Sequence, residues 1–219
     1  MRLIGTPDEA VMKACVKAFL AALSLAMAAN GAAAQSPPSG ADADDAPLVL
    51  AAQARVTNPL YRETVLLVAP FGGDRHIGVI INRPTHTTLG SLFPDDAASQ
   101  QVHDPVYYGG PMRTNALVAL VKGDASPGGR SLAIGAGLYL ALEKTVIDSV
   151  LKSRPNDGRY FVGLVIWLPG ELREELRQHY WHVPSIGPEA VLNAESGRIW
   201  RDLVQRARVL TAALEEARQ

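Results

Sequence analysis

The sequence predicts a single α+β domain built around a largely antiparallel β-sheet. Residues 58–84 hold two short apolar runs, Thr64–Ala69 and His76–Asn82, and the segment between them, Pro70–Arg75, contains two glycines. Apolar runs of this length around such a loop are typical of a β-hairpin. Both faces of each run are apolar, so we expect the hairpin at the centre of the core. The other strand-like runs follow one another with helices between only some of them. This order favours hairpins over regular βαβ units.

The remaining elements are expected in the order of the chain. Strands are predicted over Leu48–Val56, Pro105–Tyr108, Asn115–Lys122, Ser131–Ile134, Leu138–Ala141, Arg159–Leu168 and Trp181–Val183. Helices are predicted over Thr87–Phe93, Glu143–Leu151, Gly170–His179, Pro188–Asn193 and Arg198–Arg218. A threonine is expected to cap the first helix, because its hydroxyl can accept a bond from a free backbone N–H. Glu171, Glu174 and Glu175 open the third helix, where they would complement its dipole. Gly109, Gly110 and Pro111 indicate a tight turn.

The first 34 residues have the pattern of a secretory signal peptide. Lys13 and Lys17 precede the apolar run Ala18–Ala29, and Ala32–Ala34 supplies a small-residue cleavage site. Residues 35–47 are small, polar and rich in proline, which is typical of a disordered linker, and residues 48–219 then form the domain. We expect a periplasmic or secreted protein that meets the membrane only through its signal peptide during export. A mis-assigned start site is the alternative and would leave the protein in the cytoplasm.

The cysteine content and the net charge argue against several classes of function. The only cysteine, Cys15, lies within the predicted signal peptide, so the mature chain would have no disulfide, thiol nucleophile or thiolate ligand. The whole chain has 21 basic and 22 acidic residues. Removing the three basic and two acidic residues of the signal leaves 18 and 20, a formal charge of −2. Nucleic-acid binding depends on neutralising phosphates, so nucleic acid is an unlikely partner for this domain.

Two motifs resemble the YqgE/AlgH family. The first is Asn58–Arg62, an apolar strand, and then Gly78–Pro84. The second is Val106–Pro111, in which Gly-Gly-Pro follows a short strand, and a weaker match covers Gly163–Glu175. The matches occur in the family's order and cover nearly all of residues 58–210. The resemblance implies a bifurcated sheet curled into a pseudo-barrel, with helices packed outside. The family has no established activity, and its name refers to a proposed role in transcriptional regulation of alginate production.

The resemblance also indicates a weak candidate ligand site at the ends of strands. The family places Asn82-Arg83-Pro84 and Gly109-Gly110-Pro111 in such turns. The backbone N–H groups of Gly109 and Gly110 can form an anion-binding nest, with Arg62 and Arg83 supplying charge. The alternative is that glycine and proline are there for the turn geometry, with Asn82 bonding its own backbone. This sequence also departs from the family pattern. It has Asn115–Leu117 where the family has an Asp-Arg-Gly-like turn, and Val121 where the family has a histidine.

Other motifs give weaker alternatives. The spacing of His179 and His182 suits a metal, but no third ligand is adjacent in the sequence. A nucleophilic site can be assembled on paper from His103 and Asp104 with either His86 or Ser91, although the G-x-S-x-G motif is absent. Gly135–Leu140 begins like a dinucleotide fingerprint but lacks its third glycine. The arginines of the last helix are interspersed with acidic residues, which is typical of a solvated face.

From these observations we expect a non-enzymatic, exported binding or accessory protein without a cofactor or metal. Its partner would be an unidentified protein or a small anion. A cytoplasmic regulator of transcription and an unrecognised hydrolase are the alternatives.

Overall fold

The computed structural model describes residues 46–135 and 137–216. The predicted signal peptide, with Cys15, and nearly all of the predicted linker lie outside the described residues. The strands are β1 (Leu48–Ala52), β2 (Val65–Pro70), β3 (His76–Ile80), β4 (Pro84–Thr88), β5 (Pro105–Tyr108), β6 (Met112–Lys122), β7 (Ser131–Gly135), β8 (Leu138–Ala141), β9 (Gly158–Trp167) and β10 (Trp181–His182). The α-helices of the described part are α2 (Leu89–Leu92), α3 (Lys144–Ser153), α4 (Glu171–Arg177), α5 (Pro188–Leu192) and α6 (Ile199–Glu216). Short 3-10 helices cover Ser99–Gln101 and Pro155–Asp157.

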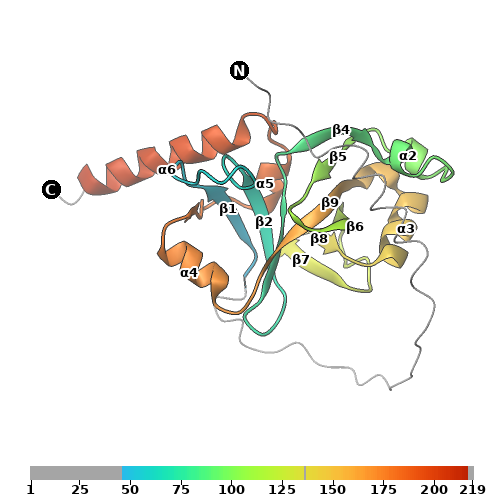
Figure 1. Cartoon of the computed structure of the whole chain (residues 1–219), viewed down its shortest axis with the longest axis horizontal. Helices are drawn as coiled ribbons and strands as arrows, with labels where there is room; N and C mark the ends of the chain where they lie inside the picture. The colour runs from blue at the N-terminus through green and yellow to red at the C-terminus, as the bar shows by residue number, and fades with distance from the viewer. Residues whose placement is uncertain (1–45, 136, 217–219) are drawn as a thin grey trace.

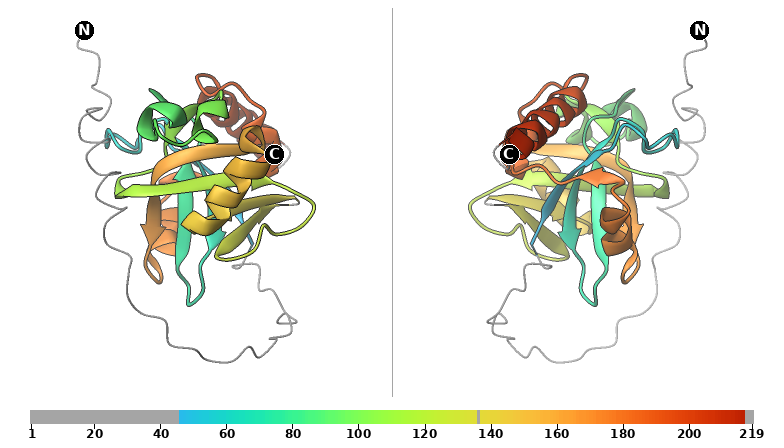
Figure 2. Two further views of the ribbon diagram at one scale, coloured as in Figure 1. Left: turned by 90° about the vertical axis from the view of Figure 1, so that its right-hand side faces the viewer. Right: turned by 90° about the vertical axis from the view of Figure 1, so that its left-hand side faces the viewer.

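The ten strands form one curled sheet, and the fold is α+β as predicted. Their order is β10-β1-β2-β3-β9-β6-β8-β7, with β4 and β5 branching from this path. The pairs are antiparallel except β5–β9, which is parallel. The sheet curls around its core without closing into a barrel. In Figure 1, α6 lies beside β1 at one end of the sheet and α3 lies beyond β6 and β8 at the other. The side views in Figure 2 show β6 running at a steep angle to the β2–β3 hairpin.

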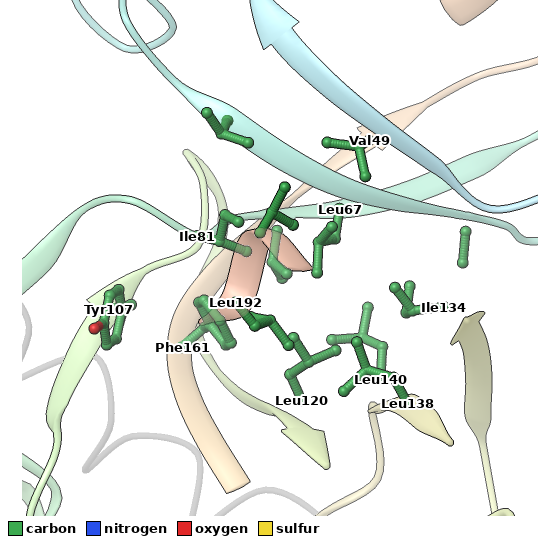
Figure 3. Close-up of a cluster of buried hydrophobic side chains, with 14 of the residues drawn as sticks. Val49, Leu67, Ile81, Tyr107, Leu120, Ile134, Leu138, Leu140, Phe161 and Leu192 are labelled. Atoms are coloured by element: carbon green, nitrogen blue, oxygen red, sulfur yellow. The ribbon is translucent and has the colours of Figure 1, made fainter. Parts of the chain in front are cut away.

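The central hairpin predicted from the sequence is confirmed. Every residue of β3 is buried, and β2 is buried up to its last residue, Pro70. Leu67 pairs with Val79 in the antiparallel register, and their side chains belong to the largest core cluster. In that cluster, shown in Figure 3, side chains of β1 and β2 face those of β6, β7, β8 and β9, and Leu192 of α5 lies between them. The two apolar faces of the hairpin are therefore both covered.

Strand β9 joins the two parts of the sheet. Its last residues pair with β3, and its first residues pair with β6 on one side and β5 on the other. Gly163 lies between Val162, which pairs with β5 and β6, and Val165, which pairs with β3, and it has φ +75°, a left-handed conformation that glycine adopts without strain. The strand can therefore change direction there, and this is the physical basis of the bifurcated sheet that the resemblance implies.

The helices cover the outside of the sheet as their apolar spacing predicts. Helix α3 buries Val146, Ile147, Val150 and Leu151. Thr88 caps α2, since its Oγ1 accepts from Ser91 N at 3.2 Å. Helix α6 buries Ile199, Leu203 and Val204 in its first half. Among the described residues, no helix is both long and apolar enough to cross a bilayer.

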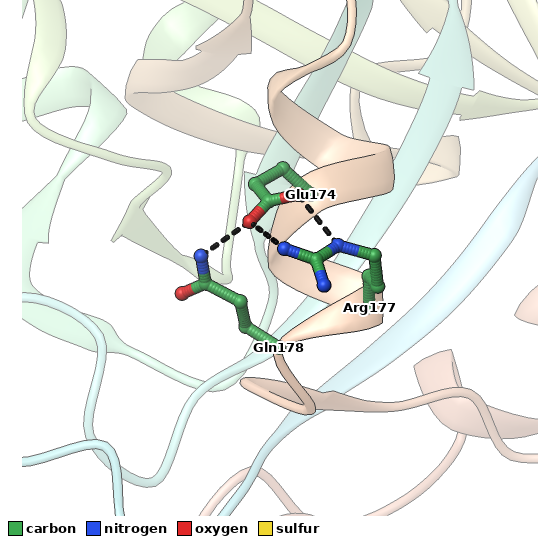
Figure 4. Close-up of polar contacts among 3 residues, drawn as sticks. All are labelled: Glu174, Arg177 and Gln178. Atoms are coloured by element: carbon green, nitrogen blue, oxygen red, sulfur yellow. Dashed lines mark hydrogen bonds and ion pairs between the residues drawn. The ribbon is translucent and has the colours of Figure 1, made fainter.

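The acidic residues of α4 have three different roles. Glu171 Oε2 accepts from the backbone N–H of Leu168 at 2.8 Å, which suits the N-terminal position expected for it. Glu174 instead pairs with Arg177 at 2.6 and 2.8 Å and accepts from Gln178 at 2.5 Å, as Figure 4 shows. The bonds from these two side chains lower the pKa of Glu174 to about 2. Glu175 points toward the core.

Several boundaries and pairings differ from the predictions. Strand β1 ends at Ala52, four residues before the predicted end at Val56, and β4 was not predicted. Gly109 and Gly110 were expected in a tight turn but continue β5 alongside β9. The carbonyl of Gly109 accepts from Ile80 N at 2.8 Å, so this segment bridges β3 and β9. A turn motif cannot reveal this pairing, because the partner strand lies about 50 residues further along the chain.

Candidate functional site

Asn82 binds the backbone on both sides of its side-chain amide. Its Oδ1 accepts from Val65 N at 2.9 Å, and its Nδ2 donates to the carbonyl of Glu63 at 2.9 Å. Asn82 follows β3, whereas the two groups that it binds lie at the start of β2. The side chain therefore fixes the entry into the central hairpin through the backbone of distant residues and not through its own backbone.

Arg83 holds the loop that precedes β2. Its Nη1 donates to the carbonyl of Leu60, and its Nη2 donates to the carbonyls of Pro59 and Arg62, each at 3.0 Å. Burial lowers the pKa of the guanidinium, and Arg62 nearby lowers it further, while Tyr108 and Glu63 oppose this. We refer to residues 58–63 as the Arg83-bound loop.

Gly109 and Gly110 allow two backbones to approach closely. Gly109 N donates to the carbonyl of Val162 at 2.9 Å. A Cβ atom on Gly109 would lie 2.2 Å from the carbonyl oxygen of Gly163, and one on Gly110 would lie 2.4 Å from the backbone of Leu164. These distances are below any van der Waals contact, so glycine is required here for space.

The structure thus brings Arg62, Asn82 and Arg83 together around the Arg83-bound loop and places Gly109 and Gly110 against β9. Asn82, Arg83 and the N–H of Gly109 already have protein acceptors. The exposed side chain of Arg62 has no hydrogen bond or ion pair within the described part of the chain. Anion binding at these turns stays a prediction, and Arg62 is the group of this set best placed to contribute to it.

A carboxylate that sequence reasoning assigned to the helix dipole lies between two tryptophans. Glu175 Oε2 accepts from Trp167 Nε1 at 2.8 Å and from Trp181 Nε1 at 2.7 Å. The ring of Tyr61, from the Arg83-bound loop, meets Trp181 edge-to-face at 6.2 Å. Burial raises the pKa of Tyr61, and the charge of Glu175 raises it further. The spacing of Glu175 from Leu172, on the buried side of α4, is the sequence signal that could have located it.

The two histidines proposed as alternative metal ligands belong to different elements. His179 is exposed at the end of α4 with φ +53°, whereas His182 lies in β10, where its Nδ1 meets Gln53 Nε2 at 3.2 Å. Burial and Arg208 lower the pKa of His182. Within the described residues, no three His, Cys, Asp or Glu side chains gather closely enough to hold a metal ion. Ser91 Oγ donates to the carbonyl of Thr88 at 2.8 Å.

A pocket of about 340 Å³ lies between the end of β6, the start of β8 and helix α5. It is lined by Lys122, Gly123, Asp124, Gly137, Leu138, Glu189, Leu192 and Asn193. Leu138 and Leu192 are buried and form its apolar part, whereas the charged and amide side chains supply polar groups. The N–H of Gly123 donates to the carbonyl of Gly137 at 3.0 Å and links the two strand ends.

The position of α5 beside this pocket is fixed from the sheet. Arg159 of β9 donates through Nη2 to the carbonyl of Leu192 at 3.1 Å, and its guanidinium lies 4.8 Å above the ring of Tyr107. Sequence reasoning did not find this pocket, because its lining comes from three segments far apart in the chain. We take the pocket as the candidate binding site.

The protein has a curled α+β fold. Its Asn-Arg-Pro and Gly-Gly-Pro segments bond to backbone groups within that fold, and this is the class of protein that the motifs imply. The chain belongs to the AlgH-like family, which it matches over residues 48–212. It is 30% identical over 166 residues to a UPF0301 protein of Streptomyces coelicolor, covering 73% of this chain and 85% of that protein. It is 26% identical over 161 residues to a UPF0301 protein of Chlorobium luteolum, covering 72% and 82%.

Two solved structures share the fold. The solution structure of the AlgH protein from Pseudomonas aeruginosa has a TM-score of 0.60 at 22% identity, covering 80% of this chain and 93% of that one. A crystal structure of a Corynebacterium diphtheriae protein has a TM-score of 0.58 at 20% identity, covering 73% and 85%. The match to the family over residues 48–212 confirms the predicted family. The names of these relatives state no reaction.

Proposed function

We propose that the protein is a non-enzymatic binding or accessory protein that acts outside the cytoplasm. The chemistry of the pocket carries this proposal. Among its described lining residues, ammonium, carboxylate and amide groups surround an apolar part, and there is no hydroxyl, thiol or imidazole side chain. Such a lining suits recognition of a small molecule better than nucleophilic catalysis.

The family motifs support the same proposal. The side chains of Asn82 and Arg83 both bind backbone groups of their own chain. Their direct role is to hold the Arg83-bound loop against β3 and β5. The location outside the cytoplasm is proposed from the basic, apolar and small-residue pattern of residues 1–34.

Cell fractionation with N-terminal sequencing tests the location. We expect a mature protein that starts near Gln35 and is found in the periplasm or the medium. A full-length cytoplasmic protein would overturn the export proposal, and the regulatory role attached to the family name would then be the one to test.

A substrate screen tests the non-enzymatic part. The purified protein is assayed against generic ester and phosphate substrates, with His103→Ala and His182→Ala as controls. We expect no turnover above that of buffer. Turnover that disappears in either variant would replace the proposal with a hydrolase that uses that histidine.

A further inference from the structure

We infer that the pocket between β6, β8 and α5 binds a small organic molecule through a primary ammonium group, with Glu189 as the acceptor. This inference names the ligand class for the binding function proposed above and rests on it.

The first observation is a shielded acceptor without a donor. Glu189 Oε1 is shielded from solvent and accepts no hydrogen bond from the described part of the chain. A shielded carboxylate oxygen without a donor costs free energy, and such groups in native proteins usually have a partner. Glu189 is one of the residues that line the pocket, and its second oxygen, Oε2, is not among the shielded atoms, so a ligand donor meets the carboxylate from that side.

The second observation is that two glycines make room for this carboxylate. A Cβ atom on Gly135 would lie 2.5 Å from Glu189 Oε1, and one on Gly187 would lie 2.9 Å from Oε2. Neither glycine has a positive φ, so the backbone would accept another residue at both positions. Space for the Glu189 side chain is therefore what glycine provides there.

The third observation is the charge and shape of the lining. The lining side chains include two carboxylates, on Asp124 and Glu189, and one ammonium group, on Lys122, and the guanidinium of Arg154 lies close to Gly123. Leu138 and Leu192 offer an apolar surface for a short aliphatic chain, and the amide of Asn193 can bind a second polar group. A volume of about 340 Å³ suits a small metabolite.

A primary ammonium on a short chain occurs both in free amino acids and in aliphatic diamines. Lys122 distinguishes the two sources, since an amino acid also carries a carboxylate that an ammonium can bind. Lys122→Ala is expected to weaken binding of an amino acid and to leave binding of a diamine unchanged or stronger. If it affected both probes alike, Lys122 would have no carboxylate to bind and the amino-acid source would be excluded.

The experiment is a titration of the full chain followed through backbone amide resonances in NMR. The probes are putrescine, leucine, acetate and glycerol, each added alone. We expect the two amines to shift the amides of Gly123, Gly137, Leu138 and Asn193. We expect Glu189→Gln to weaken amine binding about tenfold or more, equivalent to about 1.4 kcal/mol. Glu195→Gln is the matched control, because Glu195 is exposed beyond α5 and does not line the pocket.

Gly135→Ala is a second, charge-neutral variant. The added methyl group would displace the end of the Glu189 side chain, so amine binding is expected to fall while the net charge stays the same. Amine binding that is unchanged in both Glu189→Gln and Gly135→Ala would overturn the assignment of Glu189.

The remaining outcomes separate the ligand class from the binding function. If acetate or glycerol shifts the pocket amides and the amines do not, the ammonium ligand is wrong and the binding function stands. If none of the four probes shifts them, the ammonium ligand is overturned. If a broad metabolite mixture also fails to shift the pocket amides, the proposed binding function is overturned as well.

Discussion

Replacing Arg83 with alanine should release the Arg83-bound loop while the sheet stays folded. The guanidinium donates to three backbone carbonyls of that loop, each at 3.0 Å. The loop carries Tyr61, whose ring packs against Trp181. The side chain of Arg83, which follows β3, is therefore linked through this loop to Trp181 in the edge strand β10.

The magnitude follows from the number of bonds and their exposure. A hydrogen bond from a charged donor contributes about 1.5–3 kcal/mol when water is excluded. Arg83 is only half-buried and the carbonyls lie in an exposed loop, so water replaces part of what is lost. We therefore take about 1 kcal/mol for each bond, which gives a total cost of about 2–3 kcal/mol for Arg83→Ala. The loss of stability in Arg83→Lys should lie between that of the wild type and that of Arg83→Ala, because a lysine ammonium lacks the planar group with which arginine binds several carbonyls.

Hydrogen exchange locates this loss and chemical denaturation measures its size. The amides of Tyr61 and Arg62 both donate to the carbonyl of Asn58 within the loop. Their protection should fall roughly 30-fold or more in Arg83→Ala, since 1.4 kcal/mol corresponds to tenfold. Amides of β2 and β3 should be affected only as far as global stability falls.

Arg62→Ala is the matched control, because this neighbouring arginine is exposed and its side chain has no hydrogen bond within the described residues. It should change stability by less than about 0.5 kcal/mol. If Arg83→Ala were as stable as Arg62→Ala and its loop amides kept their protection, the structural role of Arg83 would be refuted. Anion binding would then be the better explanation of this residue.

Three further predictions concern the core and the strand junction. Glu175→Ala should lower the free energy of unfolding by about 2–4 kcal/mol, because two indole N–H groups lose their acceptor, whereas Glu175→Gln retains a carbonyl oxygen and should lower it less. Denaturation followed by tryptophan fluorescence compares the two variants. Equal stability of the two would contradict the assignment. Gly163→Ala should cost more than about 3 kcal/mol, because φ is +75° and the new Cβ would lie 2.2 Å from a backbone oxygen. Gly170→Ala, with φ +83° and no atom within 4 Å, is its control and should cost about 1 kcal/mol in the same denaturation assay. The hydroxyl of Tyr160 donates to a carbonyl at 3.0 Å, and burial raises its pKa to about 12. Because the pKa is raised in the folded state, the stabilisation by the Tyr160 hydroxyl is complete below about pH 10 and is lost as pH rises toward 12. The wild type should therefore lose its stability advantage over Tyr160→Phe across that interval. Denaturation at both ends of the interval tests this, and a constant difference in stability would be the contrary result.

Local patterns predicted the elements well where neighbouring residues determine them. The hairpin of β2 and β3 followed from two apolar runs and a glycine-containing loop, and the cap of α2 followed from the threonine at its start. Both features depend on interactions within a few residues or across one tight loop.

Pairings between distant segments could not be predicted in the same way. Strand β5 was expected at its observed position, but its parallel pairing with β9 depends on a strand about 50 residues further on. Gly109 and Gly110 were interpreted through turn geometry, since a glycine in a sequence does not distinguish a positive φ from a close backbone approach. The structure shows a close backbone approach at both glycines, and Gly110 also has a positive φ of 156°.

The segment around Gly135 and Gly137 illustrates the same ambiguity at the candidate site. Its spacing begins like a dinucleotide fingerprint, which was rejected because a strand follows it and not a helix. In the structure β7 ends at Gly135 and β8 begins at Leu138, so the two glycines belong to the connection of a hairpin. Gly135 leaves space for the carboxylate of Glu189, and Gly137 accepts from Gly123 at the wall of the pocket. A strand and not a helix follows the motif, as predicted. The residues that give these glycines their role come from the end of β6 and from α5, so no window of sequence around them contains the reason for their presence.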